Sequence, residues 1–287
     1  MKRALTIALT ITVLAALSVA APPNDGPFPD KNLEAAVRAL IFEKKDKKDE
    51  LTDEDCKKVF VLNAKGKEIR DLTGLEKCTN LLELNLARNE ITDITPLKDL
   101  KNLQSLDVSQ NKITNLAPIA DLTALQFLEI SHNQIANVEP LAKMAKLSAL
   151  YAAGNKISDM TPLGELSRLW SLDLASNELA KIDAVAKLPG LSTFKVSDNK
   201  IEDVSPIPKK NRLSMLFLER NKIADLQHLV DAAREDVAGE KRFAPFLRLY
   251  AAGNPLSDAG QKQLDELKSI GVRIEPETKS AASPKAK

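Results

Sequence analysis

The sequence predicts an α/β solenoid, in which short coils stack in one direction around an aliphatic core. Two observations predict this fold class. Asparagine recurs with a constant period of 22, and leucine, isoleucine or valine fills fixed positions around it. A regular period of this length indicates a repeat architecture, because one coil cannot bury its apolar side without neighbours. The regular series of asparagines comprises Asn89, Asn111, Asn133, Asn155, Asn177, Asn199 and Asn221.

Each coil follows the pattern L-x-x-L-x-L-x-x-N-x-I, as around Asn89 with Leu81, Leu84, Leu86 and Ile91. The L-x-L segment predicts a short strand whose leucines point inward, because side chains alternate along a strand. Parallel pairing of successive strands gives one sheet on the concave face. A Pro-Leu or Pro-Ile dipeptide follows the asparagine in several coils, and it predicts a short 3₁₀ or α turn on the convex face. This is the leucine-rich repeat pattern, and it predicts a horseshoe or arc.

The repeat region is predicted to span residues 59–257, with about nine repeats. A degenerate copy around Lys67 comes first. After Asn221 the next in-frame asparagine is Asn254, so this last step is longer than the others by half a period. The last repeat therefore follows an 11-residue expansion, which we expect to be helical on the convex side. In that last repeat Phe246 takes a core position of the pattern.

Both ends of the solenoid are predicted to carry caps. Residues 28–58 predict a helical N-terminal cap, with a first helix that opens at Asp30 and a second that begins after Thr52. Residues 258–275 predict a C-terminal cap of one helix and one strand. We expect residues 276–287 to be disordered, because they are rich in Lys, Ala, Ser and Pro. The apolar face of the first helix comprises Leu33, Val37, Leu40 and Ile41.

Residues 1–20 predict a secretory signal peptide, followed by a linker over 21–27. A basic start precedes an uncharged run, and small residues stand at the exit. We expect cleavage after Ala20, and hence a secreted, periplasmic or cell-envelope protein with no membrane span after cleavage. The alternative is an uncleaved transmembrane anchor, since the uncharged run could just cross a bilayer.

The composition excludes several classes of protein. Forty-one basic and 40 acidic residues leave a net charge of +1, which argues against nucleic-acid binding. No catalytic, phosphate-binding or metal-binding motif occurs, so we expect no enzyme activity, no cofactor and no metal. His132 and His228 are expected to be surface residues. The aspartates that recur shortly after the isoleucine of the pattern are expected to cap convex turns: Asp93, Asp159, Asp203 and Asp225.

The only two cysteines, Cys56 and Cys78, are separated by one repeat period. Equivalent positions on stacked coils are neighbours, so a disulfide is sterically plausible, and export permits oxidation. The alternative is a pair of buried small thiols. The sequence leaves both possibilities open.

The candidate binding surface is the concave side of the sheet. Residues four and six positions before each asparagine point out of the concave sheet, and Trp170 lies one position further out. Large apolar groups gather there beside acidic ones, as in binding hot spots. The alternative is that some rings only pack laterally along the sheet. The candidate residues are Asp107, Phe127, Glu129, Tyr151, Trp170, Asp173, Lys195, Met215, Phe217 and Tyr250.

The N-terminal third also resembles a known family. The segments "FPDKNLEAAVRAL" and "LTDEDCKKVFVLNAKGKEIRDLTGLEKCTNLLELNL", with the recurring N-x-I-T/S-D-I/M-T-P-L, are similar to the cap and first repeats of internalin-like bacterial proteins. The resemblance is specific for the fold and weak for function, since this fold hosts many binding roles. The sequence ends in neither a sorting motif nor a hydrophobic tail, so an invasion role is not expected.

Together these patterns predict an exported, non-enzymatic leucine-rich repeat protein that mediates protein–protein interaction through its concave face. The partner is expected to be a protein, and the chain itself a monomer. Two alternatives stay open at this stage. One is a carbohydrate-binding or cell-envelope-binding protein, since aromatic rings and carboxylates also suit sugars. The other is a regulatory subunit of an enzyme that acts in trans.

Overall fold

The computed structural model describes residues 27–209 and 212–276. The predicted signal peptide lies outside the described residues. So do all but the last residue of the predicted linker and all but the first residue of the predicted disordered tail. Among the residues that are described, no helix is both long and apolar enough to cross a bilayer.

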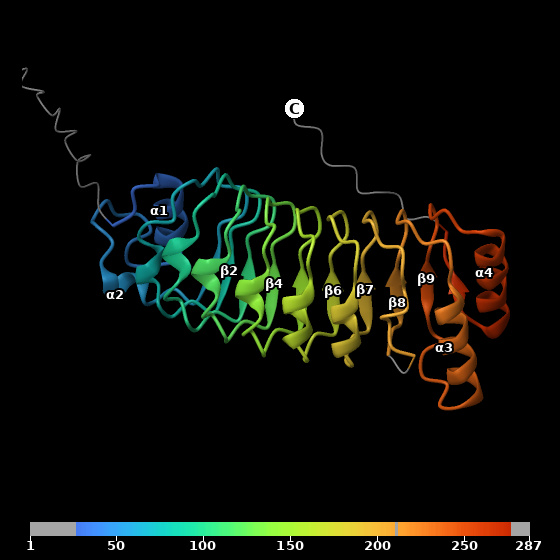
Figure 1. The fold of residues 1–287 in the computed structure, drawn as a ribbon. Coiled ribbons are helices and arrows are strands. Elements are labelled where there is room, and N and C mark those ends of the chain that lie inside the picture. Colours follow the sequence, from blue (N-terminus) through green and yellow to red (C-terminus); the bar gives the residue numbers. More distant parts are fainter. Residues whose placement is uncertain (1–26, 210–211, 277–287) are drawn as a thin grey trace, which may run out of the picture.

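One parallel sheet runs the length of the molecule, with its strands in chain order (Figure 1). Neighbouring strands pair at the repeat distance, so that Leu62 lies opposite Leu84. The predicted fold class is therefore confirmed. The strands are β1 Val61–Asn63, β2 Glu83–Asn85, β3 Ser105–Asp107, β4 Phe127–Glu129, β5 Ala149–Tyr151, β6 Ser171–Asp173, β7 Thr193–Lys195, β8 Met215–Phe217, β9 Arg248–Tyr250 and β10 Arg273–Ile274.

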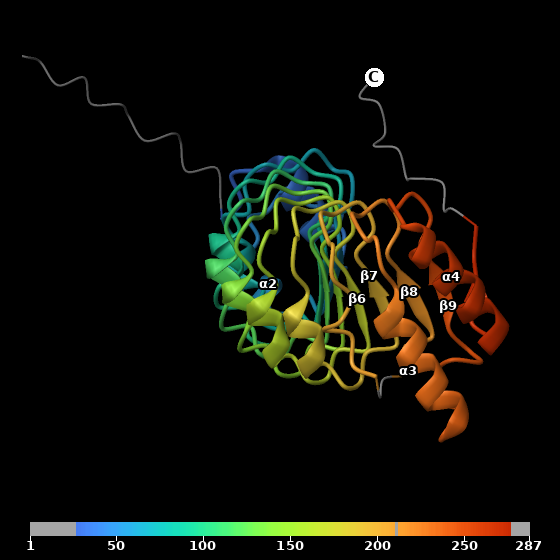
Figure 2. The ribbon, with the colours of Figure 1, turned by 45° about the vertical axis from the view of Figure 1, so that its right-hand side comes forward.

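Short 3₁₀ turns line the convex side, opposite the strands (Figure 2). Proline opens four of them, η2 to η5, where its fixed φ suits the first turn. Each of the four aspartates noted above accepts a hydrogen bond from the backbone N–H two residues on, as in Asp93 with Thr95 at 2.8 Å. Their expected capping role is thus confirmed. The turns are η1 Leu75–Lys77, η2 Thr95–Leu97, η3 Ala117–Ile119, η4 Glu139–Leu141, η5 Thr161–Glu165 and η6 Asp183–Lys187.

The repeated asparagine joins adjacent coils. The Nδ2 group of Asn133 donates to the carbonyl oxygens of Val108, in the preceding coil, and Ile130, in its own coil, both at 3.0 Å. Its Oδ1 accepts from the N–H of Ile113 in the preceding coil, also at 3.0 Å. The side chain is buried, so these bonds satisfy backbone groups that water cannot reach.

The residue just before each asparagine adopts a left-handed backbone, a feature that the sequence pattern did not reveal. In two coils it is Gly154 or Gly253, with φ of 67° and 75°. A Cβ on Gly154 would lie 2.6 Å from Nδ1 of His132 in the preceding coil, so glycine also makes room there. The remaining coils tolerate positive φ on Arg88, Gln110, His132, Ser176, Asp198 and Arg220.

The N-terminal cap contains α1 (Lys31–Arg38) and α2 (Asp53–Cys56). Asp30 caps α1, and its second carboxylate oxygen accepts from the N–H of Arg70 at 2.8 Å, which ties the cap to the first coil. Thr52 is the N-cap of α2, as expected. Leu40 was expected on the apolar face of the first helix, and this was wrong, because its side chain is 51% exposed. The helix ends before Leu40, so the apolar face does not continue through it.

The expansion forms α3 (Gln227–Ala238), which packs against the cap helix α4 (Asp258–Ile270) (Figure 2). The expectation that Phe246 lies in the core was wrong, since its side chain is 65% exposed. The N–H of Leu247 bonds to the carbonyl of Phe243 at 2.7 Å, and this tight turn puts both of those residues in the core instead. Between α3 and β9, this turn, and not the position within the 22-residue repeat, decides which side chain points inward.

Candidate functional site

The predicted surface residues project from the concave face of one continuous sheet. Each strand buries its central residue, so the residues before and after it lie on the opposite face. The structure places nine of the ten predicted residues at these flanking positions of β3 to β9. Trp170 immediately precedes β6 and is 51% exposed. The other nine are only partly buried.

Four of the aromatic rings pack in two lateral pairs. The ring centroids of Phe127 and Tyr151 are 5.6 Å apart, with their planes tilted by 49°. Phe217 and Tyr250 stack at 4.1 Å with an interplanar angle of 7°. The lateral packing considered from the sequence therefore takes place, and all four aromatic residues remain only partly buried.

Two basic groups flank the stacked pair. The Nζ of Lys195, on β7, lies 5.2 Å from the centroid of Phe217 and 3.4 Å from Asp173. The guanidinium of Arg248 lies 6.0 Å from the centroid of Tyr250 and is ion-paired with Glu275 at 2.7 Å. Since β8 lies between β7 and β9, Phe217 has Lys195 on one side and Tyr250 on the other.

The acidic residues of the face also support the backbone. Asp107, Glu129 and Asp173 each accept a hydrogen bond from the N–H two residues on, at 2.9 to 3.0 Å. Asp107 and Glu129 are direct neighbours in the register. Burial raises the pKa of Glu129, and the nearby charges of Asp107 and Asp173 add to this, against hydrogen bonds from Ser131.

These acids differ in their partners. Asp173 is paired with Lys195, whereas Asp107 and Glu129 have no ion-pair partner among the residues that the structure describes. The N-terminal half of the face therefore carries uncompensated negative charge beside the Phe127–Tyr151 pair.

A groove of about 490 Å³ runs along the ends of these strands. The predicted residues Glu129, Asp173, Lys195 and Phe217 line it, and the rest of its lining was not predicted from the sequence. Its floor consists of small residues two positions before each asparagine, such as Ala153 and Ala175. Glu219 departs from this rule: it is fully buried and accepts a hydrogen bond from Ser197 at 3.1 Å. The neighbouring Arg220 forms a bidentate pair with Asp198, at 2.6 and 2.8 Å. A glutamate in a position otherwise held mostly by Ala or Ser was the available sequence signal.

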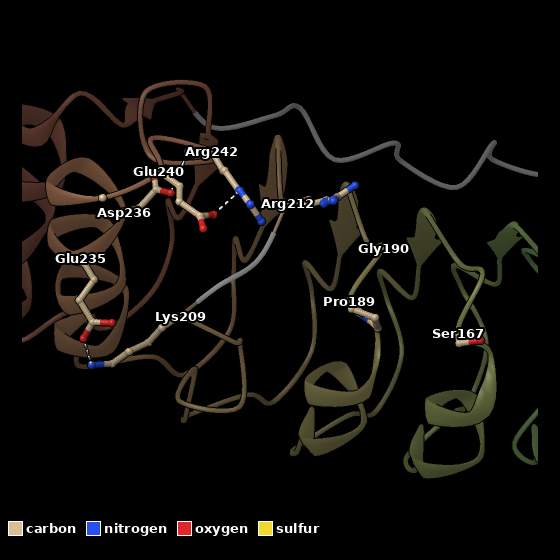
Figure 3. A pocket seen from close by; sticks show the side chains of 10 residues that line it. Ser167, Pro189, Gly190, Lys209, Arg212, Glu235, Asp236, Glu240 and Arg242 are labelled. Carbon is tan, nitrogen blue, oxygen red and sulfur yellow. Dashed lines mark hydrogen bonds and ion pairs between the residues drawn. The ribbon is translucent and has the colours of Figure 1, made fainter.

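A larger hollow of about 670 Å³ lies away from the concave face (Figure 3). It is bounded by Pro189 and Gly190 on one side and by the end of α3 on the other. Four of its charged side chains form two ion pairs, Lys209 with Glu235 and Arg242 with Glu240. None of the predicted surface residues lines it.

The cysteines and histidines occupy different environments from those of the concave face. Cys56 and Cys78 are free thiols and are fully buried. His132 is exposed, as expected. His228 is partly buried, with Nε2 2.7 Å from the carbonyl oxygen of Ile207, so it is not the plain surface residue expected. Within residues 27–209 and 212–276, no group of three His, Cys, Asp or Glu side chains is placed to hold a metal ion.

The chain is similar to known leucine-rich repeat proteins. The family described as "Leucine Rich repeats (2 copies)" matches residues 79–121 and 101–143. Internalin C2 from Listeria monocytogenes is 32% identical, with 72% of this chain and 91% of that chain covered and a TM-score of 0.67. No curated protein sequence matches the chain.

Two further solved structures are more distant. Internalin InlF from Listeria monocytogenes is 23% identical, covers 92% of this chain and 100% of its own, and has a TM-score of 0.45. The ectodomain of the plant receptor kinase GASSHO1/SCHENGEN3 from Arabidopsis thaliana is 19% identical, with 72% and 26% covered and a TM-score of 0.56. The plant ectodomain shares the fold alone.

Proposed function

Because this chain belongs to the internalin-like leucine-rich repeat proteins, we propose that it is an exported, non-enzymatic protein that binds a protein partner through its concave face. One observation carries the proposal: aromatic and acidic side chains gather, partly exposed, on one continuous sheet face. Export is proposed from the basic start and the uncharged run of residues 1–20.

The charge distribution favours a partner segment with basic side chains. Asp107 and Glu129 lie side by side, and no cation among the described residues neutralises them. A lysine or arginine from the partner would relieve their repulsion and would also lie close to the Phe127–Tyr151 rings. Aromatic anchors beside charged groups are typical of binding hot spots.

The geometry of the stacked rings argues against carbohydrate at that end of the face. Sugars stack on an open ring face, but Phe217 has Tyr250 over one side and Lys195 on the other. Its edge remains available, and a ring edge suits the side chains of a protein partner better than the face of a sugar. A glycan array with the full chain tests this choice, and saturable sugar binding would favour the carbohydrate alternative.

The binding surface is tested by replacing three of its rings. The variant Tyr151→Ala/Trp170→Ala/Phe217→Ala should lose the partner captured from the native envelope fraction. We expect at least about a 30-fold loss in affinity, equivalent to about 2 kcal/mol for one hot spot. Pull-down with the full chain as bait, followed by titration with the captured protein, measures this loss.

The matched control is Phe42→Ala/Phe246→Ala, which removes two exposed rings that lie off the concave sheet. It should capture the same protein as the wild type, and circular dichroism should show all three proteins to be folded. Equal capture by the triple variant would refute the assigned surface.

A further inference from the structure

The two cysteines lie at the junction between the N-terminal cap and the first coil. Cys56 is the last residue of α2, and Cys78 directly follows η1. Both stand six residues before Leu62 and Leu84, which face each other in the sheet. The cysteines therefore occupy the same position on adjacent coils, and both are fully buried.

Later coils fill this position with larger side chains. All of the equivalents are buried in the same apolar core, so the position itself calls for a bulky aliphatic residue. A thiol is smaller than leucine and fills less of that space. Apolar packing alone gives no reason for cysteine in two successive coils, whereas a covalent link needs both. The equivalents are Leu100, Leu122, Met144, Leu166 and Leu188.

The helix α2 packs directly against η1, so the two thiols lie on elements in contact. The interaction with Cys78 lowers the pKa of Cys56, against burial and the charges of Asp53 and Asp55, whereas the interaction with Cys56, together with burial, raises the pKa of Cys78. A disulfide requires Cα atoms within about 7 Å of each other, a separation that packed elements on adjacent coils can provide.

We propose that Cys56 and Cys78 are joined by a disulfide in the exported protein, so that the cap is covalently tied to the first coil. This inference rests on the export part of the proposed function. Export brings the chain into a compartment where disulfides form and persist.

The oxidant is the disulfide of a thiol–disulfide oxidoreductase. The Cys56 thiolate attacks one sulfur of that disulfide, and the other sulfur leaves as a thiolate. Deprotonated Cys78 then attacks Sγ of Cys56, which closes the bond and releases the oxidoreductase as a dithiol. The two thiols give up two protons and two electrons, and the oxidoreductase takes up both. Because both cysteines are buried, the exchange precedes the docking of α2 on η1.

Thiol counting tests the bond directly. The full chain is produced with its own leader, recovered from the envelope fraction, and alkylated without reductant in denaturant. We expect no alkylated cysteine, and a mass two hydrogens below that of the reduced chain. Two alkylated cysteines, or a disulfide between two chains, would overturn the proposal.

Thermal unfolding with and without reductant provides a second measurement on the same full chain, after treatment with oxidised glutathione. Reductant should lower the unfolding midpoint of the wild type by about 5–10 °C, as expected for a lost cross-link. The control Cys56→Ala/Cys78→Ala should show no dependence on reductant, whatever its own stability. A wild-type midpoint that ignores reductant, or that shifts equally in the control, contradicts the proposal. Concave-face binding is measured separately, so a failure of binding and a failure of the disulfide are distinguished. Absence of the chain from the envelope fraction would contradict export, on which the disulfide rests.

Discussion

The repeated asparagine shows how a single side chain holds two coils together. Asn133 serves four backbone groups at once, the carbonyls of three residues and one N–H, and all four residues that carry these groups are buried. A buried polar group without a partner costs about 1–3 kcal/mol. The same arrangement recurs in the neighbouring coils, so each asparagine stabilises the coil before it as well as its own.

Replacing this side chain should be costly. Asn133→Ala leaves the buried N–H of Ile113 without its acceptor, whereas the carbonyls of Val108 and Ile130 keep Asn111 and Asn155 as donors. We expect a loss of about 2 kcal/mol in the free energy of unfolding. The control Asn137→Ala removes an exposed side chain that caps only the N–H of Glu139, and it should cost about 1 kcal/mol or less. Urea unfolding of the three proteins measures both. Equal losses of unfolding free energy in the two variants would show that the buried hydrogen bonds stabilise the fold no more than the exposed one does.

At the scale of the element, the N-terminal cap depends on a reciprocal hydrogen-bonded box. The Thr52 side chain accepts from the N–H of Asp55, and the Asp55 carboxylate accepts from the N–H of Thr52 at 3.1 Å. The backbone bond from Thr52, more than any other cause, lowers the pKa of Asp55 from 3.8 to about 2. The folded cap therefore favours the ionised carboxylate.

This shift predicts the direction of the pH dependence. The folded pKa is depressed, so the stabilisation by Asp55 is fully present above about pH 4 and is lost as pH falls towards 2. Asp55→Asn should be less stable than the wild type by about 1–2 kcal/mol at neutral pH, as for other helix caps. The difference should shrink to near zero at pH 2. Unfolding midpoints across this pH range measure it.

The control for this pH dependence is Glu54→Gln, in the same helix. The Glu54 side chain is exposed and pairs only with Lys57, so its replacement should change stability by less than about 1 kcal/mol. A gap between Asp55→Asn and the wild type that stays constant from pH 7 to pH 2 would contradict the capping explanation.

For the whole molecule, stability comes from the stacking of similar units. The strands pair at one constant offset from β1 to β8, and the core runs without interruption from cap to cap. In such a chain each unit contacts only its neighbours, so stability is close to a sum of unit and interface terms. The number of repeats between the caps can therefore change without loss of the fold, provided that the strands keep their register.

Deletion of one full period tests this modularity. Removal of residues 112–133 joins Asn111 to Gln134, which occupies the position that Lys112 vacates, and we expect a folded, shorter solenoid. Removal of residues 123–133 takes out half a period, so apolar positions meet polar ones and the chain should unfold or aggregate. Circular dichroism and size-exclusion chromatography distinguish the two results. Similar behaviour of both deletions would disprove the modular account.

The sequence by itself determined the fold class, the period, and the face on which the candidate residues lie. These follow from position within the repeat, because a strand alternates its side chains and the asparagine must satisfy the same backbone groups in every coil. The position of Tyr151 or Glu129 on its strand can be predicted from its own repeat alone. The predicted capping role of Asp93 was equally local.

Only the tertiary structure decided which side chains meet. The stacking of Phe217 on Tyr250 and the charge beside it depend on distances between coils, which no pattern within one coil contains. Leu40 and Phe246 point outward because a helix end and a tight turn override the periodicity there. The packing of α2 against η1, which brings Cys56 and Cys78 to adjacent coils, is likewise a product of stacking. Local spacing sets the direction of a side chain, and packing between coils decides what it touches.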